Sequence, residues 1–309
     1  MIKRLTISIS QVAPLIGLDA YNNFPKIICE IWRKYDPTNF KILETKLKEQ
    51  GQSISTASDM NDLWEADSAL GTNILQQVKE LNANIDKTSS SMVTQQEAIN
   101  KYINNNEKLS SLDIKQKEEL TKKVCSATNK MHGIINEDSI LKEFCRLSEK
   151  TIKATQDWLE IPIINTINTI STIPIVWVLV GKYDGITTDN ELVEAKMRQK
   201  TLFKTVRNYE NVQVQLYLHA LKFENAFLVE SYTNKKGINQ IYVNEIKYDE
   251  SYVNDILIKR IINFTKFFDM FLENESIRES LLKGDKDRKI YKTYEREYLC
   301  IDNENNLEF

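Results

Sequence analysis

The 309-residue chain carries 41 Lys and Arg against 44 Asp and Glu, a formal net charge of −3, and 41% of its residues are hydrophobic. That apolar content suffices for one large domain or about two of ordinary size, and it excludes a chain that is disordered throughout. The eight glycines form neither a GxGxxG nor a GxxxxGK[ST] motif. Both motifs need glycine where the backbone approaches phosphates, so nucleotide-binding enzymes of these two kinds are excluded.

Targeting and metal-binding signals are also sparse. The longest apolar run, residues 173–180, is far shorter than the roughly 20 residues of a membrane helix. The N-terminus alternates apolar and polar residues, unlike a signal peptide. We therefore expect a cytoplasmic or nuclear protein, inside the host cell if viral, that is not secreted and has no membrane partner. Four scattered cysteines and two histidines disfavour a zinc site, so any metal must be held by carboxylates.

The N-terminal half reads as mostly helical. Residues 5–9 predict a strand, followed by a helix with Ser10 as a plausible N-cap, a break at Gly17 and a second helix over 25–32. From residue 51 to 123 the composition turns polar, although apolar residues keep a helical spacing. We expect this segment to be a mostly helical insertion, separate from residues 1–50.

The second half is richer in β-branched and aromatic residues. A helix is expected over 136–155, then a hairpin of strands over 174–180 and 191–196, a helix over 202–221, strands over 226–232 and 238–246, and a helix over 250–272. A charged C-terminal segment covers 276–309. This order predicts an α/β fold with a mixed central β-sheet flanked by helices, centred on residues 124–275.

The hairpin carries the residues best suited to catalysis. Glu194 and Lys196 are two apart on one strand, so their side chains share a face. If paired positions across the hairpin sum to 378, Asp184 lies opposite Glu194; an even-numbered loop would put the two carboxylates on opposite faces. Paired carboxylates favour a bound cation such as Mg²⁺, and Lys196 could hold or help deprotonate a water that attacks phosphorus.

Context separates this acid-x-Lys triplet from the similar ones at 44–46, 113–115, 245–247 and 287–289, which solvated faces explain. Only the triplet at 194–196 lies in an apolar strand behind an Asp-Gly. Gln213 and Tyr217 share a face of the following helix, where packing is an equally good explanation of both. Glu137, four residues after Gly133 at an expected helix start, is either a catalytic carboxylate or a first-turn acid favoured by the helix dipole.

Taken in order, GxxxE at 133–137, Asp-Gly at 184–185, ExK at 194–196 and QxxxY at 213–217 resemble the PD-(D/E)XK nuclease superfamily. The resemblance is to its RecB-like and lambda-exonuclease branch, which includes the YqaJ-type viral recombinases. Residues 7–17, with Tyr21 and Trp32, look like that branch's opening helix pair. The resemblance covers about 1–35 and 125–275 and implies a restriction-endonuclease-like core, although Tyr183 stands where the family has the proline of "PD".

The resemblance also implies roles. The implied ligands of Mg²⁺, or of Mn²⁺ as a substitute, are Glu137, Asp184, Glu194 and the carbonyl of Ala195. Lys196 would orient or activate the attacking water, and Gln213 and Tyr217 would position the helix and the DNA backbone. Ser10, with Lys3 or Arg4, would lie where lambda-type enzymes bind a terminal 5′-phosphate, although a serine at a helix N-cap also has a complete structural explanation.

A sequence pI near 5.7 argues against DNA binding, but the local charge is different. Glu194 is the sole acid between positions 194 and 207, and the basic residues there beyond Lys196 are Arg198, Lys200, Lys204 and Arg207. We expect these four to contact phosphates. In the mixed run 283–296, which includes Tyr291 and Tyr294, a solvated segment is favoured over a DNA contact.

The sequence therefore predicts a Mg²⁺-dependent exonuclease that degrades double-stranded DNA in viral recombination, repair or replication. The resemblance further implies a homotrimer and a single-strand annealing protein as partner. One alternative is a structure-specific or restriction-like endonuclease with the same metal chemistry. The other is a catalytically silent DNA-binding scaffold with the same fold.

Overall fold

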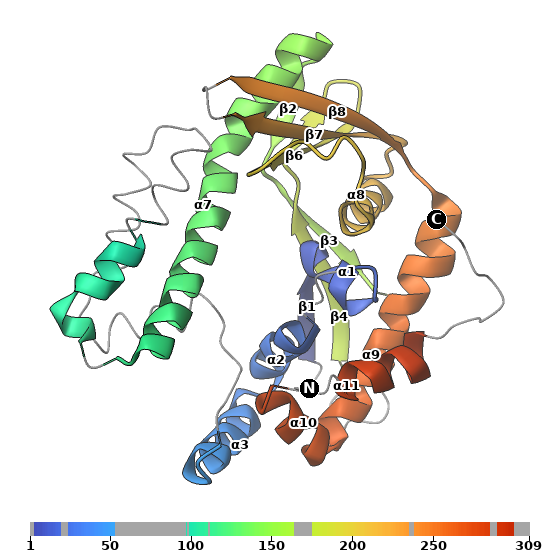
Figure 1. The fold of residues 1–309 in the computed structure, drawn as a ribbon. Coiled ribbons are helices and arrows are strands. Elements are labelled where there is room, and N and C mark those ends of the chain that lie inside the picture. The colour runs from blue at the N-terminus through green and yellow to red at the C-terminus, as the bar shows by residue number, and fades with distance from the viewer. Residues whose placement is uncertain are drawn as a thin grey trace.

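The computed structural model describes residues 3–19, 24–52, 97, 99–110, 112–163, 175–234, 238–284 and 289–299 (Figure 1). Within them the strands form two mixed sheets. The smaller sheet has the order β1–β4–β3, with β1 at Lys3–Ser8, β4 at Ile175–Lys182 and β3 at Trp158–Pro162. The larger has the order β2–β5–β6–β7–β8, formed by Ile152–Thr155, Gly185–Thr187, Leu192–Met197, Asn225–Thr233 and Asn239–Lys247. The predicted mixed α/β class with flanking helices is confirmed.

A bent two-stranded ribbon connects the two sheets. Thr155 pairs with Gly185 in one sheet and Trp158 with Lys182 in the other, so the antiparallel register is unbroken. Between these pairs the Gln156 N–H donates to the Tyr183 carbonyl at 3.1 Å, and the Tyr183 N–H donates to the Asp157 carbonyl at 3.3 Å. The chain therefore bends at 156–157 and at 183–184, side by side, where the two sheets meet.

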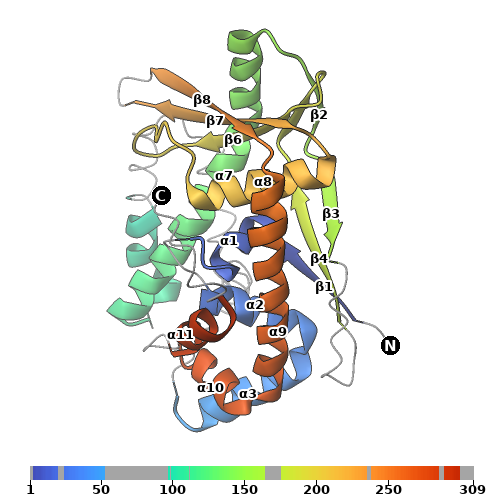
Figure 2. The same ribbon diagram turned by 90° about the vertical axis from the view of Figure 1, so that its right-hand side faces the viewer.

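Helices cover both faces of the larger sheet (Figure 2). The long helix α7 (Ile114–Ser148) packs Ile140, Leu141 and Phe144 against Val193 and Ala195. On the other face lies α8 (Asn208–Leu221), which links the parallel strands β6 and β7 and packs against alternate residues such as Leu192 and Leu228. Because side chains alternate along a strand, Glu194 and Lys196 point toward α8.

Aromatic residues hold the N- and C-terminal helices against the smaller sheet. The helices are α1 (Val12–Leu15), α2 (Phe24–Tyr35), α3 (Pro37–Glu49), α9 (Lys259–Glu273), α10 (Glu275–Leu282) and α11 (Lys289–Tyr294). Trp177 of β4 meets Phe264 and Phe268 of α9 with ring centroids 5.8 and 5.2 Å apart. Such tilted and edge-on contacts add to the gain from apolar burial.

The C-terminal segment corrects one expectation. Tyr291 and Tyr294 are buried in this aromatic cluster, and the Tyr294 hydroxyl donates to the Leu15 carbonyl at 2.6 Å. Phe24 of α2 stacks on Tyr294 with ring centroids 4.7 Å apart. The segment 289–299 therefore packs one side against the core, and neither a solvated segment nor a DNA contact describes these two tyrosines.

Several helix limits also differ from expectation. The helix expected over 136–155 is the end of α7, which ends at Ser148, and Glu149 follows with φ +59°, so 152–162 is free to form β2 and β3. The helix expected from 202 begins at Asn208, and the one expected over 250–272 is a π-helical stretch, Tyr252–Ile258, that continues into α9. Most of the polar insertion, 53–96, lies outside the described residues. None of the helices described is long and apolar enough to cross a membrane.

Asp269 of α9 gives a test of this packing. It is 2% exposed, Oδ1 has no hydrogen-bond partner among the described residues, and burial, together with Glu273, raises its pKa to about 7. Since the pKa in the folded state exceeds the unfolded value, stability should fall as pH rises from about 4 to about 7. We expect Asp269→Asn to raise the free energy of unfolding by about 2 kcal/mol at pH 8 and to change it little at pH 4.

Urea unfolding at the two pH values measures this effect. The matched control is Asp255→Asn, because Asp255 is exposed and forms an ion pair with Lys259 across one helical turn. That substitution should stay within about 0.5 kcal/mol of wild type at both pH values. If both variants change the free energy of unfolding equally at the two pH values, Asp269 is not a buried charge.

Candidate active site

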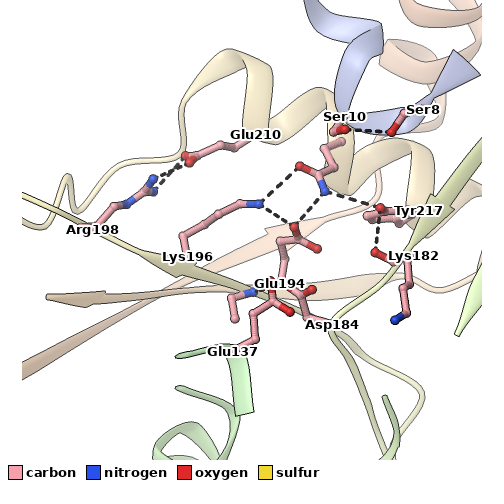
Figure 3. Close-up of polar contacts among 12 residues, drawn as sticks. Ser8, Ser10, Glu137, Lys182, Asp184, Glu194, Lys196, Arg198, Glu210 and Tyr217 are labelled. Carbon is pink, nitrogen blue, oxygen red and sulfur yellow. Dashed lines mark hydrogen bonds and ion pairs between the residues drawn. The ribbon is translucent and has the colours of Figure 1, made fainter. Parts of the chain in front are cut away.

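The hairpin register brings Asp184 and Glu194 to one site. Gly185 pairs with Val193 and Ile186 with Leu192, so paired positions sum to 378 and an odd-numbered loop, 187–191, separates them. This is the alternative that puts both carboxylates on one face (Figure 3). Asp184 Oδ2 accepts a hydrogen bond from the Ala195 N–H at 2.8 Å. Both side chains are buried, with Asp184 7% and Glu194 2% exposed, near the bend where the two sheets meet.

Lys196 and Gln213 hold one oxygen of Glu194. Lys196 Nζ donates to Glu194 Oε1 at 2.7 Å, and Gln213 Nε2 donates to the same oxygen at 2.8 Å. Gln213 Oε1 accepts from Lys196 Nζ at 3.5 Å, so each of the three side chains is hydrogen-bonded to the other two (Figure 3). The other oxygen, Glu194 Oε2, is buried and has no hydrogen-bond partner among the described residues. Buried carboxylate oxygens are normally satisfied, and this one, beside a second carboxylate, could accept a cation or a water.

Tyr217 fixes α8 against β4. Its hydroxyl donates to the Lys182 carbonyl at 3.0 Å and accepts from Gln213 Nε2 at 3.5 Å. A Cβ at Gly181 would come within 2.6 Å of the Tyr217 ring, so only glycine allows this approach. Gly181 belongs to none of the motifs recognised in the sequence. A glycine inside an otherwise β-branched strand was the signal that could have indicated a close contact.

Glu137 reaches the site from α7, where it contacts Gln156, a residue that was not predicted from the sequence. It lies well inside α7 and not at a helix start, because the helix begins at Ile114. Gln156 Nε2 donates to Glu137 Oε2 at 2.8 Å and to Asp184 Oδ1 at 3.4 Å. The Gln156 amide thus lies between the two carboxylates. No pattern in the sequence marks Gln156, whose position depends on the bend of the ribbon.

Burial dominates the electrostatics of the site. It raises the pKa of Asp184 and of Glu194 above the usual range, with Lys196 acting in the opposite direction on both. For Lys196 burial alone would lower the pKa, but Glu194 and Asp184 outweigh it and the pKa is raised. The two carboxylates therefore favour the ammonium form of Lys196, which can orient a water, and its predicted part in activating that water stays a prediction.

The donor set fits a cation that keeps most of its water. In the part of the chain that the structure describes, no group of three or more His, Cys, Asp or Glu side chains forms a metal cage by itself. Asp184 and Glu194 are two carboxylates at one place, and Glu194 Oε2 is buried without a partner. One or two carboxylates plus waters suit Mg²⁺. Glu137, with the Gln156 amide between it and Asp184, would act on such a cation through water.

The basic residues after β6 divide into one buried and three exposed. Arg198 is 8% exposed and donates from both terminal nitrogens to Glu210, at 2.7 and 3.1 Å, and from Nη2 to Glu230 at 2.8 Å. Its predicted contact with DNA is therefore wrong. Lys200, Lys204 and Arg207 are exposed on the loop 199–207, which we call the basic loop.

The predicted terminal-phosphate residues are placed less favourably. Ser10 lies in the 3-10 turn Ile9–Gln11 and caps no helix; its hydroxyl is 2.8 Å from that of Ser8. Figure 3 shows both serines on the α8 side of the carboxylates. Arg4 is exposed and paired with Glu160 at 2.6 Å, and the side chain of Lys3 lies outside the described residues. Binding of a 5′-phosphate by Ser10 stays a prediction.

Comparison with known proteins adds little to this geometry. No family model and no curated protein matches the sequence. Among solved structures, an alkaline exonuclease (LHK-Exo) from Laribacter hongkongensis is similar with a TM-score of 0.34 and 11% identity, covering 54% of this chain and 88% of that one. The complex of LHK-Exo with dAMP has a TM-score of 0.33 and 12% identity, and the same shares of the two chains are covered. SSO0001 has a TM-score of 0.33 and 15% identity, covering 52% of this chain and 71% of that one. At these TM-scores the similarity carries no argument about activity.

Proposed function

We propose that this chain is a metal-dependent nuclease that hydrolyses phosphodiester bonds of double-stranded DNA, acting from ends as an exonuclease. The observation that carries the proposal is the convergence of Asp184, Glu194 and Lys196, with one buried carboxylate oxygen that no described residue contacts by a hydrogen bond. Two buried carboxylates beside one ammonium are costly in a purely structural role, because burial disfavours their charged forms. A divalent cation would offset that cost.

The groups present suit in-line hydrolysis. Asp184 and Glu194 would hold Mg²⁺, or Mn²⁺ in its place, and such an ion neutralises developing charge on a phosphate and lowers the pKa of water. Lys196, kept as an ammonium by the carboxylates, would hold the attacking water in line with the phosphorus. Gln213 fixes the directions of Glu194 and Lys196, and Tyr217 holds Gln213's helix to β4.

The basic loop supplies a surface for the DNA backbone. It begins three positions after Lys196 and carries Lys200, Lys204 and Arg207 as exposed cations. Arg207 lies over the ring of Phe203, with Cζ 4.0 Å from the centroid, which holds its guanidinium in place. Exposed cations on the loop that follows β6 would compensate for the acidic net charge when a phosphate chain approaches.

Incubation of the purified protein with linear duplex and with closed circular duplex tests the proposal. In Mg²⁺ we expect the linear DNA to be degraded to nucleotides, the circle to be spared, and EDTA to abolish cleavage. Cutting of the circle would replace the exonuclease by an endonuclease with the same site. Binding of DNA with no cleavage in Mg²⁺ or Mn²⁺ would overturn the proposal in favour of a silent scaffold.

A further inference from the structure

Gln156 joins two elements that approach the carboxylates from different directions. Glu137 comes from the middle of α7, and Asp184 from the bend between β4 and β5. The Gln156 amide nitrogen donates to Glu137 Oε2 at 2.8 Å and to Asp184 Oδ1 at 3.4 Å. An amide NH₂ has two hydrogens, so it can serve both carboxylates at once.

The backbone of Gln156 is in an unfavourable conformation. Its φ is +58°, in the left-handed region that side-chain-bearing residues rarely adopt. Its N–H donates to the Tyr183 carbonyl at 3.1 Å, which ties this bend to the bend that carries Asp184. Glycine would adopt this conformation more easily, so a change to glycine can remove the side chain without straining the backbone.

The chemistry of an amide suits the place between two acids. A carboxylate at position 156 would add a third negative charge, and a lysine would compete with a cation for the same oxygens. The neutral amide donates one hydrogen bond to each of the two acids without adding charge.

We propose that Gln156 is a positioning residue, which fixes the Glu137 and Asp184 carboxylates relative to each other for cation binding through its bridging amide. This inference rests on the proposed function. Residues that hold metal-binding side chains in place typically contribute about tenfold to hundredfold in metal affinity or activity. A positioning role predicts a loss in kcat and in Mn²⁺ affinity, with KM for DNA unchanged.

Gln156→Gly is the informative variant, because glycine relieves the left-handed backbone while it removes the amide. We expect its melting temperature to equal or exceed that of wild type. Its Mn²⁺ dissociation constant, measured by electron paramagnetic resonance of free Mn²⁺, should rise about tenfold or more. Its kcat should fall by a similar factor. Raised Mn²⁺ should restore part of the rate. Lys222→Gly is the matched control, since Lys222 has the same φ of +58° and lies exposed at the end of α8.

The outcomes separate this inference from the function on which it rests. If wild type binds Mn²⁺ and cuts DNA while Gln156→Gly matches the Lys222→Gly control in affinity and kcat, the positioning role is wrong and the nuclease stands. If Gln156→Gly melts lower than wild type while its Mn²⁺ affinity matches that of the control, Gln156 is structural and the positioning role is also wrong. A wild-type protein that neither binds Mn²⁺ nor cuts DNA overturns both.

Discussion

Asp184→Asn should reduce Mg²⁺-dependent cleavage of linear duplex by about a thousandfold or more, equivalent to about 4 kcal/mol of activation free energy. The substitution keeps the size of the side chain and an oxygen that can accept from the Ala195 N–H. It removes one of the two negative charges that would hold the cation. Initial rates at saturating DNA, measured over a range of Mg²⁺ concentrations, give the effect.

The same variant should not be destabilised when metal is absent. Burial raises the pKa of Asp184, so at pH 8 its ionisation opposes folding, and below about pH 4, where the carboxyl is protonated in both states, this effect disappears. In EDTA at pH 8 the variant should therefore unfold at the same or a higher urea concentration than wild type. Asp189→Asn, in the exposed turn of the same hairpin, is the control and should cut at the wild-type rate. Unchanged cleavage by Asp184→Asn would exclude the assigned site.

The hairpin was predictable because its rules are local. Alternation places Glu194 and Lys196 on one face, and the sum of 378 leaves a single register in which Asp184 faces them. The strands β7 and β8 lie close to their expected limits for the same reason. Turn residues and apolar runs that lie within about ten positions of one another were sufficient to predict these strands. The site was predictable to the extent that it is built from this hairpin and the next helix.

Long-range pairing was not predictable. Arg198 counted as one more surface cation in the sequence, but its partners stand 12 and 32 residues later, on α8 and β7. Tyr291 and Tyr294 lie in a run of basic residues in the sequence, yet α11 turns both toward Phe24, and Tyr294 also contacts Phe267 of α9. Gln156 depends on a backbone bend that no composition reveals. In each case a contact distant in sequence overrode the local polarity.

The interior ion-pair network around Glu230 should carry the largest stability effect. Glu230 is fully buried on β7; Oε1 accepts from Arg198 at 2.8 Å, and Oε2 accepts from the backbone N–H groups of Phe203 and Lys204 at 2.7 and 3.2 Å. Glu230→Ala leaves Arg198 with Glu210 alone and leaves both amides unpaired. We expect the free energy of unfolding to fall by about 3 kcal/mol or more in urea titrations at neutral pH.

Glu245→Ala is the matched control, because Glu245 is an exposed carboxylate on the neighbouring strand β8 and its loss should cost at most about 0.5 kcal/mol. The Glu230 bonds also fasten the basic loop to the sheet at Phe203 and Lys204. Freeing the loop should weaken duplex binding at low salt, measured at a temperature where the variant stays folded. Superimposable unfolding curves for the two variants would show that the network contributes no net stability. Unchanged DNA affinity in a destabilised Glu230→Ala would separate the network's role in folding from any role in presenting Lys200, Lys204 and Arg207.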